Sequence, residues 1–144
     1  MTEPKLLPGV RALDRLFKAN KAFSIEHMDD AALVRAQTTA IPDAGPAAFV
    51  ASLFMGRPAA GVTVAISSFP AAHGDLPLRI YTPDRPAGAR PVVLNFHGGG
   101  FALGSARQCD WTCSTVADDL DAVVVSVDYR LAPTHRFPAA VEDC

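Results

Sequence analysis

Three consecutive glycines follow a short apolar segment, and they are the residues of this chain best suited to chemistry. Residues 91–96 read Pro-Val-Val-Leu-Asn-Phe, and His97, Gly98, Gly99 and Gly100 come directly after them. Because glycine has no Cβ, the backbone there can adopt dihedral angles closed to other residues and bring its N–H groups close to a ligand atom. Such N–H groups can stabilise a negatively charged oxygen. The pattern therefore predicts an anion-binding loop at the end of a strand.

His97 opens the glycine loop, and its ring has two possible roles: proton transfer or support of the loop. We favour support, because hydrogen bonds from the imidazole would hold the loop with its N–H groups converging on one point. Asp128 and Arg130 follow a later apolar segment and are candidates for a partly buried ion pair that fixes their loop. All three residues are therefore predicted to support the glycine loop and not to react.

Apolar patterns predict the elements that must position these residues. Residues 91–96 and 122–127 are short apolar runs typical of parallel strands that are buried on both faces. Between them, residues 108–120 have the period of an amphipathic helix. The expected unit is therefore strand, helix, strand, the repeating element of an α/β sheet.

The segments before this unit predict a hairpin and helices. Alternating apolar residues indicate strands at 61–68 and 76–82, which we expect to pair antiparallel across a short turn. Amphipathic patterns indicate helices over 8–22 and 24–37, and residues 46–55 form a further short apolar piece of helical character.

At two places the sequence resembles the hormone-sensitive-lipase-like branch of the α/β-hydrolases, the bacterial family IV esterases and lipases. The first place is the His-Gly-Gly-Gly-Phe loop at residues 97–101. The second begins with Asp-Tyr-Arg-Leu-Ala-Pro at 128–133 and continues with Phe-Pro-Ala-Ala at 137–140 and Glu-Asp at 142–143. The two motifs occur in the order that the family has.

The resemblance implies an α/β fold, the N-terminal half of an α/β-hydrolase sheet. It would contain the first four strands and the helix between strands 3 and 4. Residues 1–58 are expected to form N-terminal cap or lid helices, and residues 59–144 a partial core. The sequence departs from the family at Thr134 and Arg136, where the family carries an acidic residue and a proline. This loop is therefore expected to have a different conformation or to be under relaxed constraint.

In this family the glycine loop supplies part of the oxyanion hole, so the resemblance assigns that role to Gly98, Gly99 and Gly100. The family's nucleophile is a serine within Gly-x-Ser-x-Gly, a pattern that these 144 residues do not contain. Ser105 comes nearest, but it lacks flanking glycines at both required offsets. No member of the catalytic triad is assigned, and ester hydrolysis is expected only together with a C-terminal half.

Three interpretations of function stay open at this point. The chain is the N-terminal part of a serine carboxylesterase or lipase, or it is a non-catalytic binding or regulatory module of the same fold. The third interpretation is a remnant without function. The first predicts a missing C-terminal half, the second predicts stable folding alone, and poor accumulation in the cell would favour the third.

Composition restricts the partners. The formal net charge is −2, the pI is about 6.0, and Lys and Arg are scattered, which argues against nucleic acid and anionic membranes. No apolar run reaches the roughly 18 residues of a membrane span, and the N-terminus lacks a signal-peptide pattern, so a cytoplasmic location is predicted. Cys109, Cys113 and Cys144 have no metal-binding spacing, and neither a metal nor a cofactor is expected.

The expected partners follow from the family resemblance and from the predicted sheet. In its complete form the protein would bind a small acyl ester. The strand at 91–96 would present an apolar edge, which invites association with a C-terminal half of the same fold or with a second copy of the chain.

Overall fold

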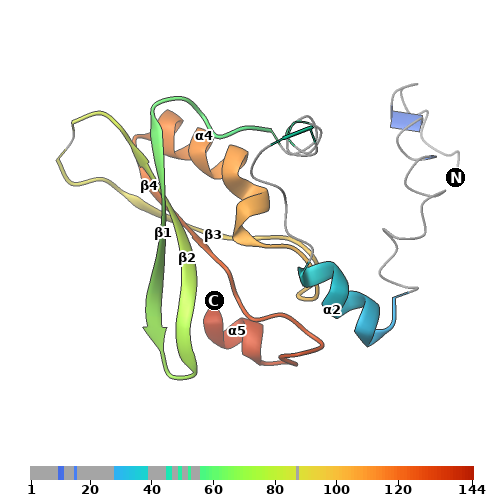
Figure 1. Ribbon diagram of the computed structural model, residues 1–144. Coiled ribbons are helices and arrows are strands. Elements are labelled where there is room, and N and C mark those ends of the chain that lie inside the picture. Colours follow the sequence, from blue (N-terminus) through green and yellow to red (C-terminus); the bar gives the residue numbers. More distant parts are fainter. Residues whose placement is uncertain are drawn as a thin grey trace, which may run out of the picture.

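The structure is a computed structural model that describes residues 28–38, 56–86 and 88–144, together with residues 10, 11, 15, 45, 46, 49 and 52. Its elements in chain order (Figure 1) are α2 (Asp30–Thr38), β1 (Val62–Ala71), β2 (Gly74–Pro83), β3 (Val92–Phe96), the 3-10 helix η3 (Ala106–Cys109), α4 (Asp110–Leu120), β4 (Val123–Val127) and α5 (Ala139–Asp143). The helices predicted over 8–22 and 46–55 lie largely outside the described residues.

Helix α2 begins at Asp30; the sequence pattern predicted a helix from residue 24, and residues 24–27 lie outside the described residues. Met28 and Asp29 are not helical. The Asp29 carboxylate accepts a hydrogen bond from the Ala32 N–H at 2.7 Å. An aspartate in this position satisfies an N–H group that a helix otherwise leaves without a partner in its first turn. Asp29 therefore defines the start of α2.

Four strands form one sheet in the order β1-β2-β4-β3. β1 and β2 pair antiparallel along their whole length, from Val62 opposite Pro83 to Ala71 opposite Gly74. β4 lies between the other strands, antiparallel to β2 and parallel to β3. These pairings confirm the predicted hairpin, the predicted first four strands and the helix between the third and fourth.

Side chains pack against both faces of the sheet. Because successive strand residues point to opposite faces, Val124 and Val127 lie on different sides of β4. The buried cluster on the α4 side consists of Tyr81, Cys113, Ala117 and Val124. The cluster on the other side, which includes a residue of α5, consists of Leu76, Val127, Tyr129 and Ala140. α4 and α5 therefore pack on opposite faces of the sheet.

A polar contact fastens α4 to β2. The Asp110 carboxylate, at the first residue of α4, accepts hydrogen bonds from the Tyr81 hydroxyl at 2.7 Å and from Arg79 Nε and Nη2 at 2.8 Å each. Burial raises the pKa of the Tyr81 hydroxyl, and the Asp110 carboxylate adds to that effect. Tyr81 therefore stays protonated and acts as the donor. A carboxylate in the first turn also complements the positive end of the helix dipole.

The prediction that the strand at 91–96 is buried on both faces is wrong. β3 is at one edge of the described sheet, and Val92, Leu94 and Phe96 are 64%, 58% and 43% exposed. α4 packs on the face that carries Val93, whereas the cluster around α5 does not include these three side chains. An apolar run shows that a strand has no polar face, but it does not show whether a neighbour covers each face.

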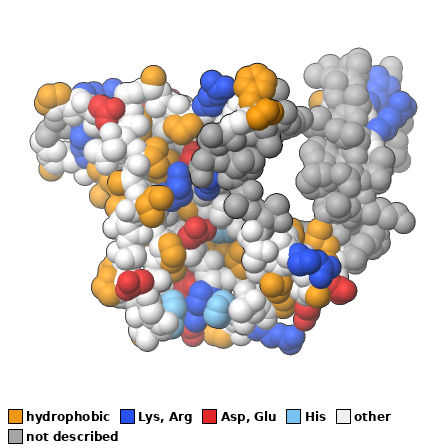
Figure 2. Space-filling view, in the orientation of Figure 1, with side chains coloured by type: hydrophobic (Ala, Val, Ile, Leu, Met, Phe, Trp, Pro, Cys, Tyr) orange, Lys and Arg blue, Asp and Glu red, His pale blue; other side chains and the backbone are white. Residues whose placement is uncertain are grey.

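Charged side chains of both signs are interspersed on the face of the molecule that Figure 2 shows. Hydrophobic side chains reach the surface between them. Among the large hydrophobic residues of the described strands, Ile66 of β1 has the highest exposure, at 79%. The mixture of charges on this face agrees with the scattered Lys and Arg residues of the sequence.

The uneven coverage of the sheet can be tested with two alanine variants. Val124→Ala is expected to lower the free energy of unfolding by roughly 2 kcal/mol, because it removes two methyl groups from a buried position and leaves a cavity. Leu94→Ala removes more atoms, but from a side chain that is 58% exposed, so we expect a change below about 0.5 kcal/mol. Urea unfolding followed by circular dichroism measures both. Equal losses would show that this face of β3 is covered in solution.

Candidate functional site

The loop that follows β3 turns sharply within the three glycines. Gly99 and Gly100 have φ of 134° and 61°, and Phe101 also has a positive φ, of 60°. A Cβ at Gly99 would lie 2.5 Å from the carbonyl carbon of Leu103 and closer still to its carbonyl oxygen. Leu103 N–H donates to Gly99 O at 3.0 Å, which closes the turn. Only glycine fits at position 99, because both the φ and the approach of Leu103 exclude a side chain.

The glycines on either side of this turn differ in how much space surrounds them. At Gly98 the nearest atom to an added Cβ is Gln108 Nε2, at 4.0 Å. At Gly104, which the sequence analysis did not single out, a Cβ would lie 2.5 Å from Gly98 O and 2.9 Å from His97 Nδ1, and φ is 94°. The loop therefore closes on itself, with Gly104 packed against its start.

His97 lies under the loop, where its residue is 4% exposed. Its Nδ1 is 3.0 Å from Gly98 O, and its ring stacks on Tyr129 with centroids 4.2 Å apart and planes 6° apart. Since a carbonyl oxygen only accepts, Nδ1 is the donor in this contact. Among the described residues Nε2 has no hydrogen-bond partner, and Asp128 Oδ1 lies 3.7 Å away.

The segment after β4 connects the glycine loop with η3. Asp128 Oδ1 accepts a hydrogen bond from Ala106 N–H at 2.9 Å, at the first residue of η3. The Tyr129 hydroxyl donates to His97 O at 2.5 Å. Burial raises the pKa of the Tyr129 hydroxyl, which keeps it protonated as a donor. Asp128 therefore contacts both the start of η3 and the His97 ring.

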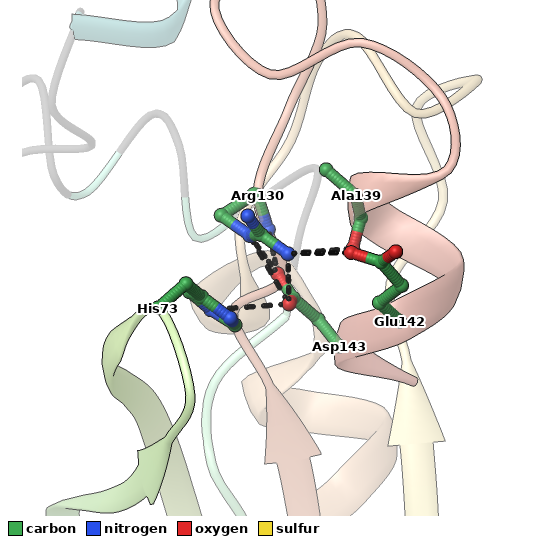
Figure 3. Close-up of polar contacts among 5 residues, drawn as sticks. All are labelled: His73, Arg130, Ala139, Glu142 and Asp143. Atoms are coloured by element: carbon green, nitrogen blue, oxygen red, sulfur yellow. Dashed lines mark hydrogen bonds and ion pairs between the residues drawn. The ribbon is translucent and has the colours of Figure 1, made fainter.

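The predicted ion pair between Asp128 and Arg130 is wrong, because Arg130 pairs with Asp143 instead (Figure 3). Arg130 Nη2 lies 2.9 Å from Asp143 Oδ1, and Arg130 N–H donates to Oδ2 at 2.8 Å. His73 Nε2, from the turn between β1 and β2, lies 3.2 Å from Asp143 Oδ1. The Asp143 side chain is 0% exposed and the Asp128 side chain 37%. A buried carboxylate needs a cation more than a half-exposed one does, which explains the choice.

The electrostatics of Asp143 depend on this pairing. Burial by itself raises the pKa of the Asp143 carboxyl, but the hydrogen bonds from Arg130 outweigh it, so the pKa lies below the ordinary value of 3.8. Asp143 is the last residue of α5, and His73 belongs to the hairpin. The cluster of Arg130, Asp143 and His73 therefore ties the end of α5 to the segment after β4 and to the hairpin.

Three side chains that contact the site were not found from the sequence. Gln108 Nε2 donates to Gly98 O at 2.8 Å, and Tyr129 stacks on His97. Gln37 of α2 donates from Nε2 to Ala102 O at 2.8 Å and to Ala132 O at 2.6 Å. Tyr129 lies inside a recognised motif and gave a signal, whereas Gln37 gave none, since its partners are 65 and 95 residues away.

Among the described residues, neither Ser105 nor a metal site adds a reactive group to the glycine loop. Ser105 lies on extended backbone before η3, with φ −158° and ψ 162°, and not on a strained turn after a strand. Within the described ranges, no group of three or more His, Cys, Asp or Glu residues is arranged to hold a metal ion. None of the helices described has the length and apolar character needed to cross a membrane.

Comparison with known proteins adds the following. A family model for the alpha/beta hydrolase fold matches residues 93–144. The carboxylic ester hydrolase LipN of Mycobacterium tuberculosis is 36% identical over 134 residues, which cover 91% of this chain and 33% of LipN. The esterase LipI of the same organism is 56% identical over 72 residues, 49% of this chain and 22% of LipI. A solved structure of a bacterial heroin esterase matches with a TM-score of 0.71 at 33% identity, over 100% of this chain and 42% of that one.

The chain thus spans 22% to 42% of the length of these three proteins. The sheet and the matches show that the chain has part of the α/β-hydrolase fold. Within that fold it resembles the hormone-sensitive-lipase-like esterases, as its two sequence motifs indicated, and its relatives are carboxylesterases and lipases.

The pairing of Asp143 generates a pH-dependent prediction. Asp143→Asn is expected to lower the melting temperature at neutral pH by roughly 5 °C, because a neutral amide replaces the charged partner of Arg130. The folded pKa is lowered, so the stabilisation is present above pH 3.8 and is lost as the pH falls through the folded value. The unsubstituted chain should therefore lose stability more steeply than the variant below about pH 4.

Thermal unfolding followed by circular dichroism at a series of pH values measures this difference. Glu142→Gln is the matched control, because Glu142 also contacts Arg130, at 3.3 Å, but its side chain is 61% exposed. We expect little change from it. Parallel acid limbs for the unsubstituted chain and Asp143→Asn would contradict the assignment.

Proposed function

We propose that this chain carries the oxyanion-stabilising loop of a carboxylic ester hydrolase, with Gly98, Gly99 and Gly100 as the loop that binds the substrate oxygen. In this proposal the substrate is a small acyl ester, and hydrolysis requires a nucleophile-bearing segment outside residues 1–144. The loop geometry and the esterases among its relatives support the proposal.

One observation carries the proposal: the carbonyl groups of the loop are held by donors. Gly98 O lies 2.8 Å from Gln108 Nε2 and 3.0 Å from His97 Nδ1. In a trans peptide the N–H group points opposite to the C=O group of the same peptide unit. Because Gly98 O is held toward Gln108 and His97, the Gly99 N–H is turned away from them.

The next peptide unit of the loop is held in the same way. Gly99 O accepts hydrogen bonds from Leu103 N–H at 3.0 Å and from Ala102 N–H at 3.2 Å. The Gly100 N–H is therefore turned away from the inside of the turn. Two successive N–H groups with fixed directions are what stabilisation of an oxyanion needs, because such donors need no reorganisation when charge develops.

The proposed reaction assigns each part a role. A serine from outside residues 1–144 attacks the ester carbonyl carbon, and the carbonyl oxygen becomes an oxyanion. The N–H groups of the glycine loop donate hydrogen bonds to that oxygen, and one such donor is worth about 10²–10³ in kcat. His97 and Asp128 hold the loop from below and transfer no proton in this scheme. The serine's proton passes to a base in the same outer segment.

The proposal predicts that the purified chain of 144 residues shows no turnover of 4-nitrophenyl acetate above background. The oxyanion loop acts only when a nucleophile has created the tetrahedral centre. Release of 4-nitrophenolate at constant pH measures this. Steady turnover that scales with chain concentration and disappears in Ser105→Ala would instead assign the nucleophile to the chain.

The role of the loop is tested by joining residues 1–144 to the C-terminal part of LipN, starting where the two sequences cease to match. In this joined protein Gly99→Ala is expected to lower kcat by about 10²–10³, since the loop can no longer hold its N–H groups in place. Gly98→Ala should have a far smaller effect, because a Cβ there meets nothing closer than 4.0 Å.

Gly88→Ala serves as the control, since a Cβ at Gly88 meets no atom within 4 Å. Circular dichroism of each variant shows whether the protein still folds. Equal kcat values for the Gly99→Ala and Gly88→Ala proteins, both folded, would refute the assignment of the glycine loop.

A further inference from the structure

We propose that Gln37 of α2 is a positioning residue for the glycine loop and makes the N-terminal helix part of the apparatus that holds the oxyanion site. This inference rests on the proposed function and extends it to a residue outside both sequence motifs. Gln37 touches no reacting atom in this scheme, and it acts by fixing the backbone that does.

The Gln37 side chain bridges two loops that are far apart in sequence. Its Nε2 donates to Ala102 O at 2.8 Å and to Ala132 O at 2.6 Å. Ala102 belongs to the turn that follows the glycines, and its own N–H donates to Gly99 O at 3.2 Å. Gln37 therefore holds the carbonyl group of the same residue whose N–H helps to set the direction of the Gly100 N–H.

The two loops also contact each other beside Gln37. Ala132 N–H donates to Phe101 O at 2.9 Å. Phe101 O belongs to the peptide unit directly before the one that carries Ala102 O. The backbone bond and the two bonds from Gln37 together join the glycine loop to the segment after β4. Without Gln37 the glycine loop would stay joined to the segment after β4 by the Ala132–Phe101 backbone bond and by Tyr129, but the two bonds that hold Ala102 O and Ala132 O would be lost.

The chemistry of the junction requires an amide side chain. Both partners of Gln37 are carbonyl oxygens, which only accept, so both must face the NH₂ group and not the amide oxygen. A single NH₂ group has two donors and satisfies both carbonyls at once. A glutamate of the same shape would place carboxylate oxygens against two carbonyl oxygens, which repel them.

A second contact of α2 is weaker. At the other end of the helix, Asp30 Oδ2 lies 3.7 Å from Arg136 Nη2, and the two side chains are 72% and 80% exposed. Exposed ion pairs contribute little and are screened by salt. The part-buried bonds of Gln37 can therefore fix backbone position more firmly than this ion pair does.

The test uses three variants of the full chain. Gln37→Met keeps the length of the side chain and its preference for a helix but donates no hydrogen bond. Gln37→Glu keeps the shape and removes the donors. Thr38→Ala is the matched control on the same helix, because the Thr38 hydroxyl donates within α2, to Arg35 O at 2.9 Å.

Amide hydrogen exchange measured by NMR gives the first readout. In Gln37→Met the amides of Ala102, Leu103 and Ala132 are expected to exchange about tenfold faster. Gln37→Glu should accelerate them more, and Thr38→Ala should leave them unchanged. The amides of β4 should keep their rates in all three variants. Unchanged loop amides, or equal acceleration in β4, would overturn the proposal.

The second readout is the kinetics of the joined protein described above. Gln37→Met is expected to lower kcat about tenfold while KM changes less than about twofold, because a misplaced oxyanion donor affects the transition state more than ground-state binding. Unchanged kcat in Gln37→Met, together with a loss in Gly99→Ala, would overturn the positioning role. Unchanged kcat in Gly99→Ala would refute the proposed function itself, and the exchange rates would still report on Gln37.

Discussion

The direction of two carbonyl groups in the glycine loop is the constraint on which the rest of the site depends. Gly98 O accepts a hydrogen bond from Gln108 of η3 and Gly99 O accepts hydrogen bonds from Ala102 and Leu103, so the N–H groups that follow them point the other way. The close approach of Leu103 to Gly99 is possible only without a Cβ. Backbone geometry, and no single reactive side chain, is therefore what these residues contribute.

The groups that hold this loop come from elements spread along the chain. His97 follows β3, Gln108 lies in η3, Tyr129 follows β4, and Gln37 comes from α2. Because β3 and β4 are adjacent and parallel, the segments that follow them leave the sheet at the same edge and can contact each other directly. The sheet thus brings the two motifs together, although they are separated by a helix in sequence.

Features that depend on residues close together in the chain were predicted correctly from the sequence. The predictions failed where distant elements decide burial or where two carboxylates compete for one arginine. The hairpin, β3, α4 and β4 each have a period or an apolar run of their own, and the need for glycine at Gly99 is also local. The exposure of β3 depends on which neighbours cover it. The partner of Arg130 depends on the relative burial of two carboxylates, Asp128 and Asp143, which a sequence does not display.

Arg136, one of the two positions where the sequence departs from the pattern of the family that it resembles, contacts Asp30. Arg136 replaces the family's proline, and a proline could neither pair with Asp30 nor leave the backbone equally free. The resulting ion pair is exposed, so its strength depends on ionic strength, whereas the bonds of Gln37 at the other end of α2 do not carry net charge. Salt therefore screens the Asp30–Arg136 contact, which contributes little, and leaves the glycine loop held at Gln37.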